Sequence, residues 1–117
     1  MRSPETCAPD GGRGRTGRYA LRMAAYVVVD IQVKDPVRYE EYKKQALPSV
    51  TAFGGRYLVR GGAVTKLEGD WTPGRFVVLE FPNVARAKEW WSSDLYRPIK
   101  AIRHATASTK MILVEGT

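Results

Sequence analysis

Residues 53–62 read Phe53-Gly54-Gly55-Arg56-Tyr57-Leu58-Val59-Arg60-Gly61-Gly62, a strand-like segment with a glycine pair at each end. Glycine adopts positive-φ backbone conformations that residues with a Cβ resist, so both pairs predict turns. A second strand-like run follows at residues 75–82, Arg75-Phe76-Val77-Val78-Leu79-Glu80-Phe81-Pro82. Its single carboxylate, on Glu80, is costly among apolar neighbours unless it has a partner or faces water. The two runs predict strands joined by a glycine-containing connection.

The segments before these strands have a strand pattern and then a helix pattern. Residues 25–34 alternate in period two, which predicts a strand with one face formed by Ala25, Val27, Val29, Ile31 and Val33. Asp35-Pro36 predicts a helix start, with Asp35 as the N-cap and Pro36 in the first turn. We expect Pro48 to interrupt this helix and Gly54-Gly55 to end it. Its predicted apolar face consists of Tyr39, Tyr42, Ala46, Val50 and Phe53.

The C-terminal part of the chain predicts a divided helical region and a last strand. Asn83 is the expected N-cap of a helix that residues 92–94 break. Pro98 is compatible with a helix only in its first turn, so a new segment begins there. The apolar stripe of that segment is predicted to be Leu95, Ile99, Ile102 and Ala105. Residues 109–115 are expected to form the last strand.

The order of these elements is strand-helix-strand-strand-helix-strand. This order is typical of the ferredoxin-like fold, an α+β class with one antiparallel sheet and helices on one face. Alternation along the strands then leaves the other sheet face open, with Tyr26, Val28, Phe76 and Val78 on it. Because such an apolar face is poorly compatible with water, the pattern predicts a homodimer in which a second copy covers it.

Length and charge predict one domain preceded by an extension. The chain has 117 residues and a net charge of +7, with arginine and glycine concentrated in residues 1–22. We expect residues 1–22 to be disordered and residues 23–117 to form the single domain, because the extension has too little apolar surface to offset its ordering entropy. Arginine and glycine also occur in nucleic-acid-binding segments, but here only Tyr19 is interleaved with them, which argues against nucleic acid as a partner. A translation start at Met23 is the favoured explanation of the extension.

Composition also limits location and cofactors. The only cysteine, Cys7, cannot form an internal disulfide, and no apolar stretch approaches the roughly 20 residues that span a bilayer. These features predict a soluble cytoplasmic protein without a membrane partner. One cysteine and one histidine are too few for a zinc site, and the glycine pairs match neither the phosphate-binding loop nor the dinucleotide motif. No metal and no cofactor are therefore expected.

Residues spread along the whole domain carry a family resemblance. They are Asp35-Pro36, Tyr39, Tyr42, the run 53–62, Leu67-Glu68-Gly69, Leu79-Glu80-Phe81-Pro82, Ala87, Trp90-Trp91, Ser93, Tyr96 and Arg103. In one register over about residues 24 to 116, this pattern resembles the uncharacterised domain-of-unknown-function family 1330. The resemblance implies a ferredoxin-like domain of the dimeric α/β-barrel type. Wider relatives of that fold include small monooxygenases, isomerase-like enzymes, haem-degrading proteins and proteins with no known chemistry, so the fold assigns no activity.

The first group of candidate residues faces away from the helices. Strand alternation places Asp30 and Glu80 on the open sheet face, and Arg60 joins them unless a bulge changes its side. Two carboxylates and an arginine in a semi-apolar setting form either an acid/base site or an anchor for a polar ligand. The favoured interpretation is structural: an ion pair of Glu80 with Arg60 or Arg103 fixes the strand register or seals the dimer.

The second group surrounds the last helical segment. Arg103 follows Tyr96 by two helical turns, so both line one helix face. The aromatic residues expected around them are Tyr42, Trp90 and Trp91. Aromatic rings with one cation suit a flat or anionic organic ligand. The competing interpretation puts the rings in the core, pairs Arg103 with Glu80 or Glu68, and leaves His104 on the surface rather than acting as a base.

Three functions follow from these alternatives. The leading hypothesis is a homodimer that binds a small organic or anionic metabolite, with ligand contacts from Tyr42, Arg60, Glu80, Trp90, Tyr96 and Arg103. The second is an acid/base or monooxygenase-like enzyme that uses Glu80, Arg60 and Arg103, with Asp30 and His104 as further catalytic candidates. The third is a dimer module whose polar residues are purely structural.

Overall fold

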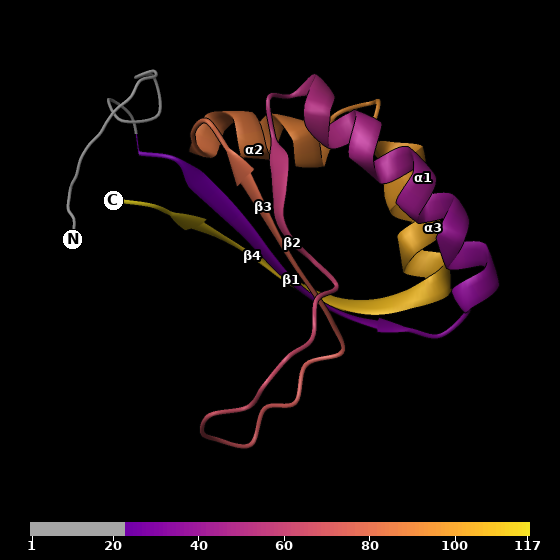
Figure 1. Ribbon diagram of the computed structural model, residues 1–117. Coiled ribbons are helices and arrows are strands. Elements are labelled where there is room, and N and C mark those ends of the chain that lie inside the picture. Colours follow the sequence, from indigo (N-terminus) through magenta and orange to yellow (C-terminus); the bar gives the residue numbers. More distant parts are fainter. Residues whose placement is uncertain (1–22) are drawn as a thin grey trace.

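Residues 23–117, the part of the chain that the computed structural model describes, form one four-stranded sheet with three helices (Figure 1). The predicted disordered extension, residues 1–22, lies outside this part. The elements are β1 (Ala25–Val33), α1 (Pro36–Ala52), β2 (Arg56–Arg60), β3 (Arg75–Phe81), α2 (Val84–Ser92), α3 (Arg97–Thr106) and β4 (Ala107–Glu115). All strand pairs are antiparallel and the sheet order is β2-β3-β1-β4. The predicted α+β, ferredoxin-like fold with one antiparallel sheet is confirmed.

The helices begin where their capping residues predicted. The Asp35 carboxylate accepts a hydrogen bond from the backbone N–H of Arg38 at 3.2 Å, and Asn83 Oδ1 accepts one from Arg86 N at 2.9 Å. Pro98 lies in the first turn of α3, as expected. Pro48 does not end α1, which continues to Ala52. Across residues 23–117, no helix combines the length and apolar character needed to cross a membrane.

The core lies between the sheet and the helices. Along β1, Ala25, Val27, Val29 and Ile31 are buried, while the residues between them face the other side of the sheet. Figure 1 shows the helices on one side of the sheet and the opposite side uncovered. The largest fully buried side chains of the core are those of Trp90, Tyr96 and Phe81. The predicted inward and outward faces of β1 are therefore confirmed.

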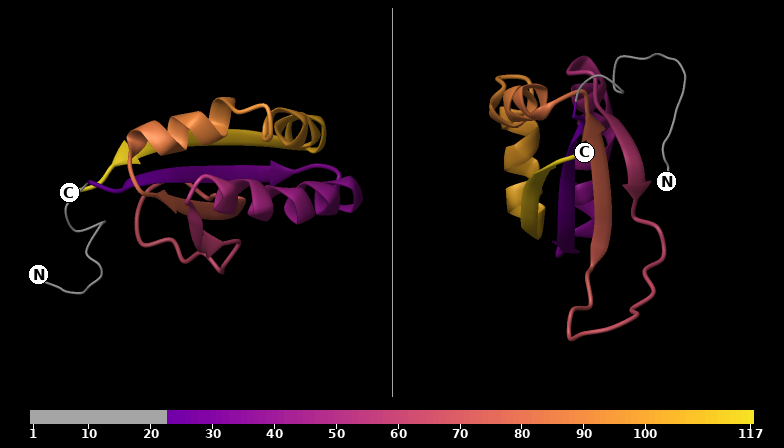
Figure 2. Two further views of the ribbon diagram at one scale, coloured as in Figure 1. Left: turned by 90° about the horizontal axis from the view of Figure 1, so that it is seen from above. Right: turned by 90° about the vertical axis from the view of Figure 1, so that its left-hand side faces the viewer.

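Both glycine pairs sit at turns. Gly54 has a φ of 79° and Gly61 a φ of 73°, in the left-handed region that favours glycine. After Gly61 the chain forms the long β2–β3 connection, residues 61–74, which projects beyond the end of the sheet (Figure 2). The predicted turns and connection are confirmed.

Two predicted details of the C-terminal part were wrong. The buried face of α3 consists of Ile99, Arg103 and Thr106, whereas Leu95 and Ala105 are exposed. The helix begins only at Arg97, so Leu95 lies in the preceding turn. A buried arginine is rare, which is why the apolar pattern misplaced this face. β4 begins at Ala107, two residues before the predicted start at Thr109.

A bulge in β2 changes the side of Arg60. The β2–β3 register shifts between Tyr57 and Val59, so Arg60 lies opposite Val77. Val77 is buried and faces the helices, and Arg60 Nη2 donates to the α1 carbonyl of Lys43 at 3.2 Å. Arg60 therefore lies on the helix side and not on the open face with Glu80.

Candidate functional site

Glu80 forms an ion pair on the open sheet face, but with a residue other than those predicted. Arg56 Nε donates to Glu80 Oε1 at 2.7 Å, because Arg56 lies directly across from Glu80 in the β2–β3 register. The predicted pairing with Arg60 or Arg103 was wrong. Glu80 is 7% exposed, and burial together with the Glu80 charge raises the pKa of the neighbouring Tyr26. Glu80 therefore shares no site with Arg60, which faces the helices.

Asp30 lies on the same face but far from Glu80. In the register with β3, Asp30 pairs with Phe76 and Tyr26 with Glu80, a separation of four residues and about 13 Å along the strand. Asp30 accepts hydrogen bonds from Trp71 Nε1 and Gly74 N, each at 2.9 Å. These bonds lower the pKa of the Asp30 carboxyl group. Asp30 fastens the end of the β2–β3 connection to the sheet rather than forming a carboxylate pair.

The structure does bring the predicted aromatic residues together. The hydroxyl groups of Tyr42 and Tyr96 lie 2.7 Å apart, and the ring centroids of Trp90 and Tyr96 are separated by 4.2 Å. Trp90 Nε1 donates to Ser49 Oγ at 3.1 Å. Burial is the largest cause of the raised pKa of Tyr42. Because their polar atoms already have partners, these three rings form a wall and not a reactive centre.

Arg103 differs from the rest of this cluster. The residue is 3% exposed, yet its guanidinium group makes no hydrogen bond or ion pair within residues 23–117, and Nε is fully buried. The predicted pairing with Glu80 or Glu68 was therefore wrong. A buried cation without a partner is strongly disfavoured, because it loses its hydration without compensation. Such a group is a strong marker for a missing anion.

Arg103 borders a groove of about 530 Å³ formed by α2, α3 and β4. Thr109, on β4, also lines it, and its Oγ1 is a second buried atom without a hydrogen-bond partner in the described part of the chain. The remaining lining residues are Val27, Ala87, Lys88, Trp90, Trp91, Ser92, His104, Met111, Ile112 and Leu113. The lining contains no carboxylate. The groove thus combines apolar walls with unpaired hydrogen-bond donors.

The rim of the groove carries further positive and aromatic groups. Trp91 is 47% exposed, with Lys100 Nζ 3.4 Å from its ring centroid. His104 is exposed, and partial burial, followed by the charges of Arg103 and Lys100, lowers the pKa of its imidazole. At neutral pH His104 is therefore mainly neutral and can donate or accept a hydrogen bond.

Thr109 and Lys88 line the groove but were not predicted from the sequence. Period-two alternation in the last strand would place Thr109, Met111 and Leu113 on one face, which was a usable signal. For Lys88 no signal was available, because an exposed lysine on a helix is ordinary.

Residues 24–117 match the family described as Domain of unknown function (DUF1330). The chain belongs to this family. No curated protein matches this DUF1330 protein by sequence. Its fold is similar to that of a protein of unknown function from Rhodopseudomonas palustris, RPA0582, with a TM-score of 0.68, 16% identity and coverage of 86% of this chain and 90% of that chain.

Two further solved structures share the fold of this DUF1330 protein. SnoaB, a cofactor-independent oxygenase from Streptomyces nogalater, has a TM-score of 0.54 and 11% identity, covering 81% of this chain and 94% of that chain. A conserved protein from Methanosarcina mazei Go1 has a TM-score of 0.55 and 18% identity, covering 86% of this chain and 97% of that chain. At these identities the similarity establishes the fold alone.

Proposed function

We propose that this DUF1330 protein binds a small organic anion in the groove between α2, α3 and β4. The observation that carries the proposal is Arg103, a buried guanidinium group without a partner in residues 23–117, at a groove whose lining has no carboxylate. An anion bound there supplies the missing counter-charge, and a planar carboxylate matches the two-pronged geometry of a guanidinium group. The buried Thr109 hydroxyl group offers a further hydrogen bond.

The walls of the groove indicate the chemistry of the part of the ligand that does not contact Arg103. Trp90, Met111 and Leu113 present apolar surface, and Trp91 offers an aromatic face at the rim. Ligand sites of 300–1,000 Å³ typically combine such walls with a few polar groups that fix orientation. The ligand class is therefore a carboxylate, or a similar oxyanion, attached to a flat apolar body.

A screen with matched compounds tests this function. Aromatic carboxylates are expected to raise the melting temperature, while the corresponding neutral amides and amines leave it unchanged. Ligand at 100 times its dissociation constant stabilises the folded state by about 2.7 kcal/mol, which corresponds to a rise of roughly 10 °C in a domain of this size. Equal shifts with carboxylates and amides would contradict a site built around Arg103. The absence of any shift would favour the purely structural dimer module.

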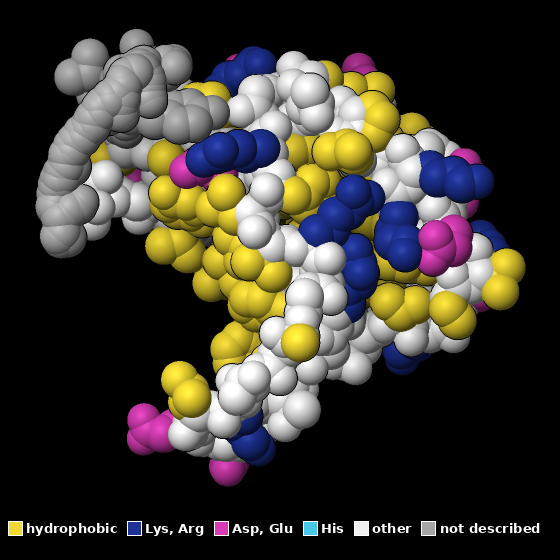
Figure 3. All heavy atoms as spheres, viewed as in Figure 1, with side chains coloured by type: hydrophobic (Ala, Val, Ile, Leu, Met, Phe, Trp, Pro, Cys, Tyr) yellow, Lys and Arg dark blue, Asp and Glu magenta, His cyan; other side chains and the backbone are white. Residues whose placement is uncertain are grey.

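We also propose that the open sheet face mediates a homodimer. Ile112 and Val114 of β4 are 60% and 44% exposed on this face, beside the half-buried Val28, Phe76 and Val78. Hydrophobic side chains form a continuous band there in Figure 3. Contiguous exposed apolar surface of this kind is typical of a protein–protein interface, which covers about 800 Å² per partner. We propose a cytoplasmic location as well, on the basis of the single cysteine.

Light scattering is expected to report a dimer, at twice the chain mass of 13.1 kDa, at micromolar concentration. Val114→Asp should shift the protein toward the monomer, because it places a charge on the covered face. The matched variant Val37→Asp, at an exposed position of α1, should leave the dimer intact. A monomeric wild-type protein would refute the proposed interface.

A further inference from the structure

A second, much smaller cavity lies between α1, β2 and β3. Its volume is about 20 Å³, enough for one small group and not for an organic ligand. Trp90 and Met111 line both this cavity and the Arg103 groove, so they form the shared wall. The polar residues around the small cavity are Tyr39, Tyr42, Lys43, Tyr57, Arg60 and Arg75. None of the residues that line it is acidic.

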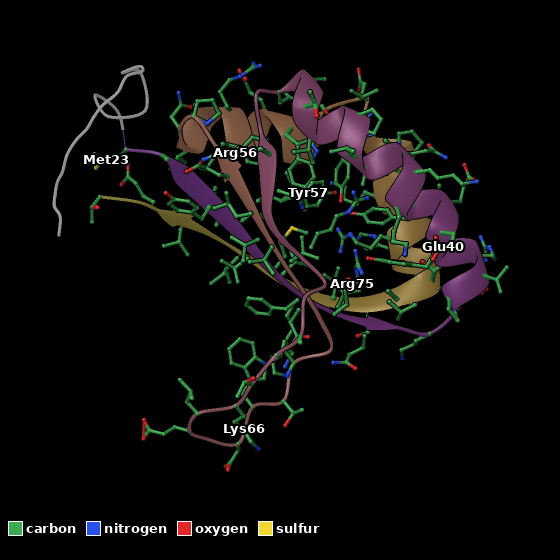
Figure 4. The ribbon with its side chains drawn as sticks, in the orientation of Figure 1. Met23, Glu40, Arg56, Tyr57, Lys66 and Arg75 are labelled. Atoms are coloured by element: carbon green, nitrogen blue, oxygen red, sulfur yellow. The ribbon has the colours of Figure 1, made fainter. Side chains whose placement is uncertain are left out.

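Two local features of the backbone direct the arginines into this space. The bulge in β2 turns Arg60 to the helix side, where its guanidinium group lies 4.6 Å from the ring centroid of Tyr57. Arg75, the first residue of β3, passes over Gly61, and a Cβ at Gly61 would clash with Arg75 Nη1. Any other residue at this position would therefore require the end of the Arg75 side chain to move. Figure 4 shows Tyr57, Arg75 and Glu40 around this space, and in Figure 3 Lys and Arg side chains gather between β2 and α1.

The cavity presents hydrogen-bond donors under physiological conditions. Burial raises the pKa of Tyr57 to about 12 and also raises the pKa of Tyr39, although nearby arginines oppose both shifts. Both phenol groups are therefore protonated and can donate. Arg75 Nε is buried and has no hydrogen-bond partner in the described residues. Glu40, an exposed acid on α1 whose charge interacts with that of Arg75, pairs with Lys43 Nζ at 2.8 Å.

We propose that this cavity is a second anion site, which binds one small oxyanion group, a carboxylate or a phosphate, on Arg75, Arg60 and the phenol groups of Tyr39 and Tyr57. The positive charges and donors converge on a space that holds a single group of this size. Since the mouth includes Arg60 and Lys43, the group is either a free inorganic anion or the end of a ligand that extends outside. Trp90 and Met111 separate the site from the groove at Arg103.

Titration of the protein with small anions tests the site, at a constant ionic strength that chloride maintains. Inorganic phosphate and formate probe a free anion, and phenyl phosphate probes the end group of a larger ligand. Binding is expected to be saturable and to shift the Nε–H resonance of Arg75, which is assigned by its absence in Arg75→Met. Arg60→Met and Tyr57→Phe should each weaken binding at least tenfold. Arg38→Met, an exposed arginine on the outer side of α1, should leave it unchanged.

The same variants separate this site from the proposed function. Arg60→Met should retain the response to aromatic carboxylates, and Arg103→Met should retain phosphate and formate binding. Because Arg60 is exposed, its replacement leaves folding intact even if Arg75→Met does not fold. Equal binding by Arg60→Met, Tyr57→Phe and Arg38→Met would overturn the proposal, as would an Arg75 resonance that does not move. Loss of small-anion binding in Arg103→Met alone would also overturn it, by assigning the anion to the groove.

Discussion

Arg103→Met is expected to make the ligand-free protein more stable while it abolishes binding of organic anions. The guanidinium group of Arg103 is buried and has no hydrogen bond or ion pair in residues 23–117, so a methionine of similar length removes a desolvated charge and keeps most of the packing. Replacing buried ionic groups with apolar residues of similar volume is often neutral or stabilises a protein by about 1–4 kcal/mol, and the absence of a partner for Arg103 favours a gain. Urea unfolding would measure this gain, and the thermal response to aromatic carboxylates would disappear.

Arg97→Met is the matched control for this experiment. Arg97 is on the same helix, is exposed, and pairs with the exposed Asp94. Its replacement should change the free energy of unfolding by less than about 1 kcal/mol and leave ligand binding intact. A loss of stability of about 3 kcal/mol or more in Arg103→Met would contradict the proposal, because it would mean that Arg103 has a strong internal partner.

Trp90→Ala is expected to lower the free energy of unfolding by about 3–5 kcal/mol, the usual cost of removing a large buried ring. Trp90 is 1% exposed, its ring centroid lies 5.4 Å from that of Phe81, and its Nε1–H bonds to Ser49. Such a loss is large against a typical total stability of about 5–15 kcal/mol. Urea unfolding of both proteins would measure the difference.

The adjacent Trp91→Ala gives a direct comparison. Trp91 is 47% exposed, so its loss should cost less than about 1 kcal/mol. The same change should weaken the binding of aromatic carboxylates, because it removes the ring at the rim of the groove. Equal losses in the free energy of unfolding for Trp90→Ala and Trp91→Ala would contradict this prediction, because they would show that burial does not determine the cost of removing either ring.

The sequence predicted the elements of the fold because their signals are local. Alternation in residues 25–33 gave the faces of β1, and Asp35 and Asn83 gave the helix starts through their side-chain caps. The bulge that moves Arg60 to the helix side has no comparable signal, since Tyr57, Leu58 and Val59 are ordinary strand residues. The pairing of Arg56 with Glu80 also has no local signal, because it depends on the register between β2 and β3.

The candidate site was predictable only in part. Tyr42, Trp90 and Tyr96 lie together as their spacing indicated, and Arg103 lies at the groove beyond them. That Arg103 has no partner could not be predicted, because pairing depends on which side of the sheet each acid occupies. Glu80 lies on the open face of the sheet, so it cannot pair with Arg103 on the helix side.

The hydrogen bonds of Asp30 affect the cost of removing water from the open sheet face. Its carboxylate oxygens already accept bonds from Trp71 and Gly74, which take the place of water around them. Glu80 is solvated in the same internal way by Arg56. Covering this face with another surface therefore leaves each carboxylate with internal hydrogen-bond donors, so its burial costs less than that of a bare charge.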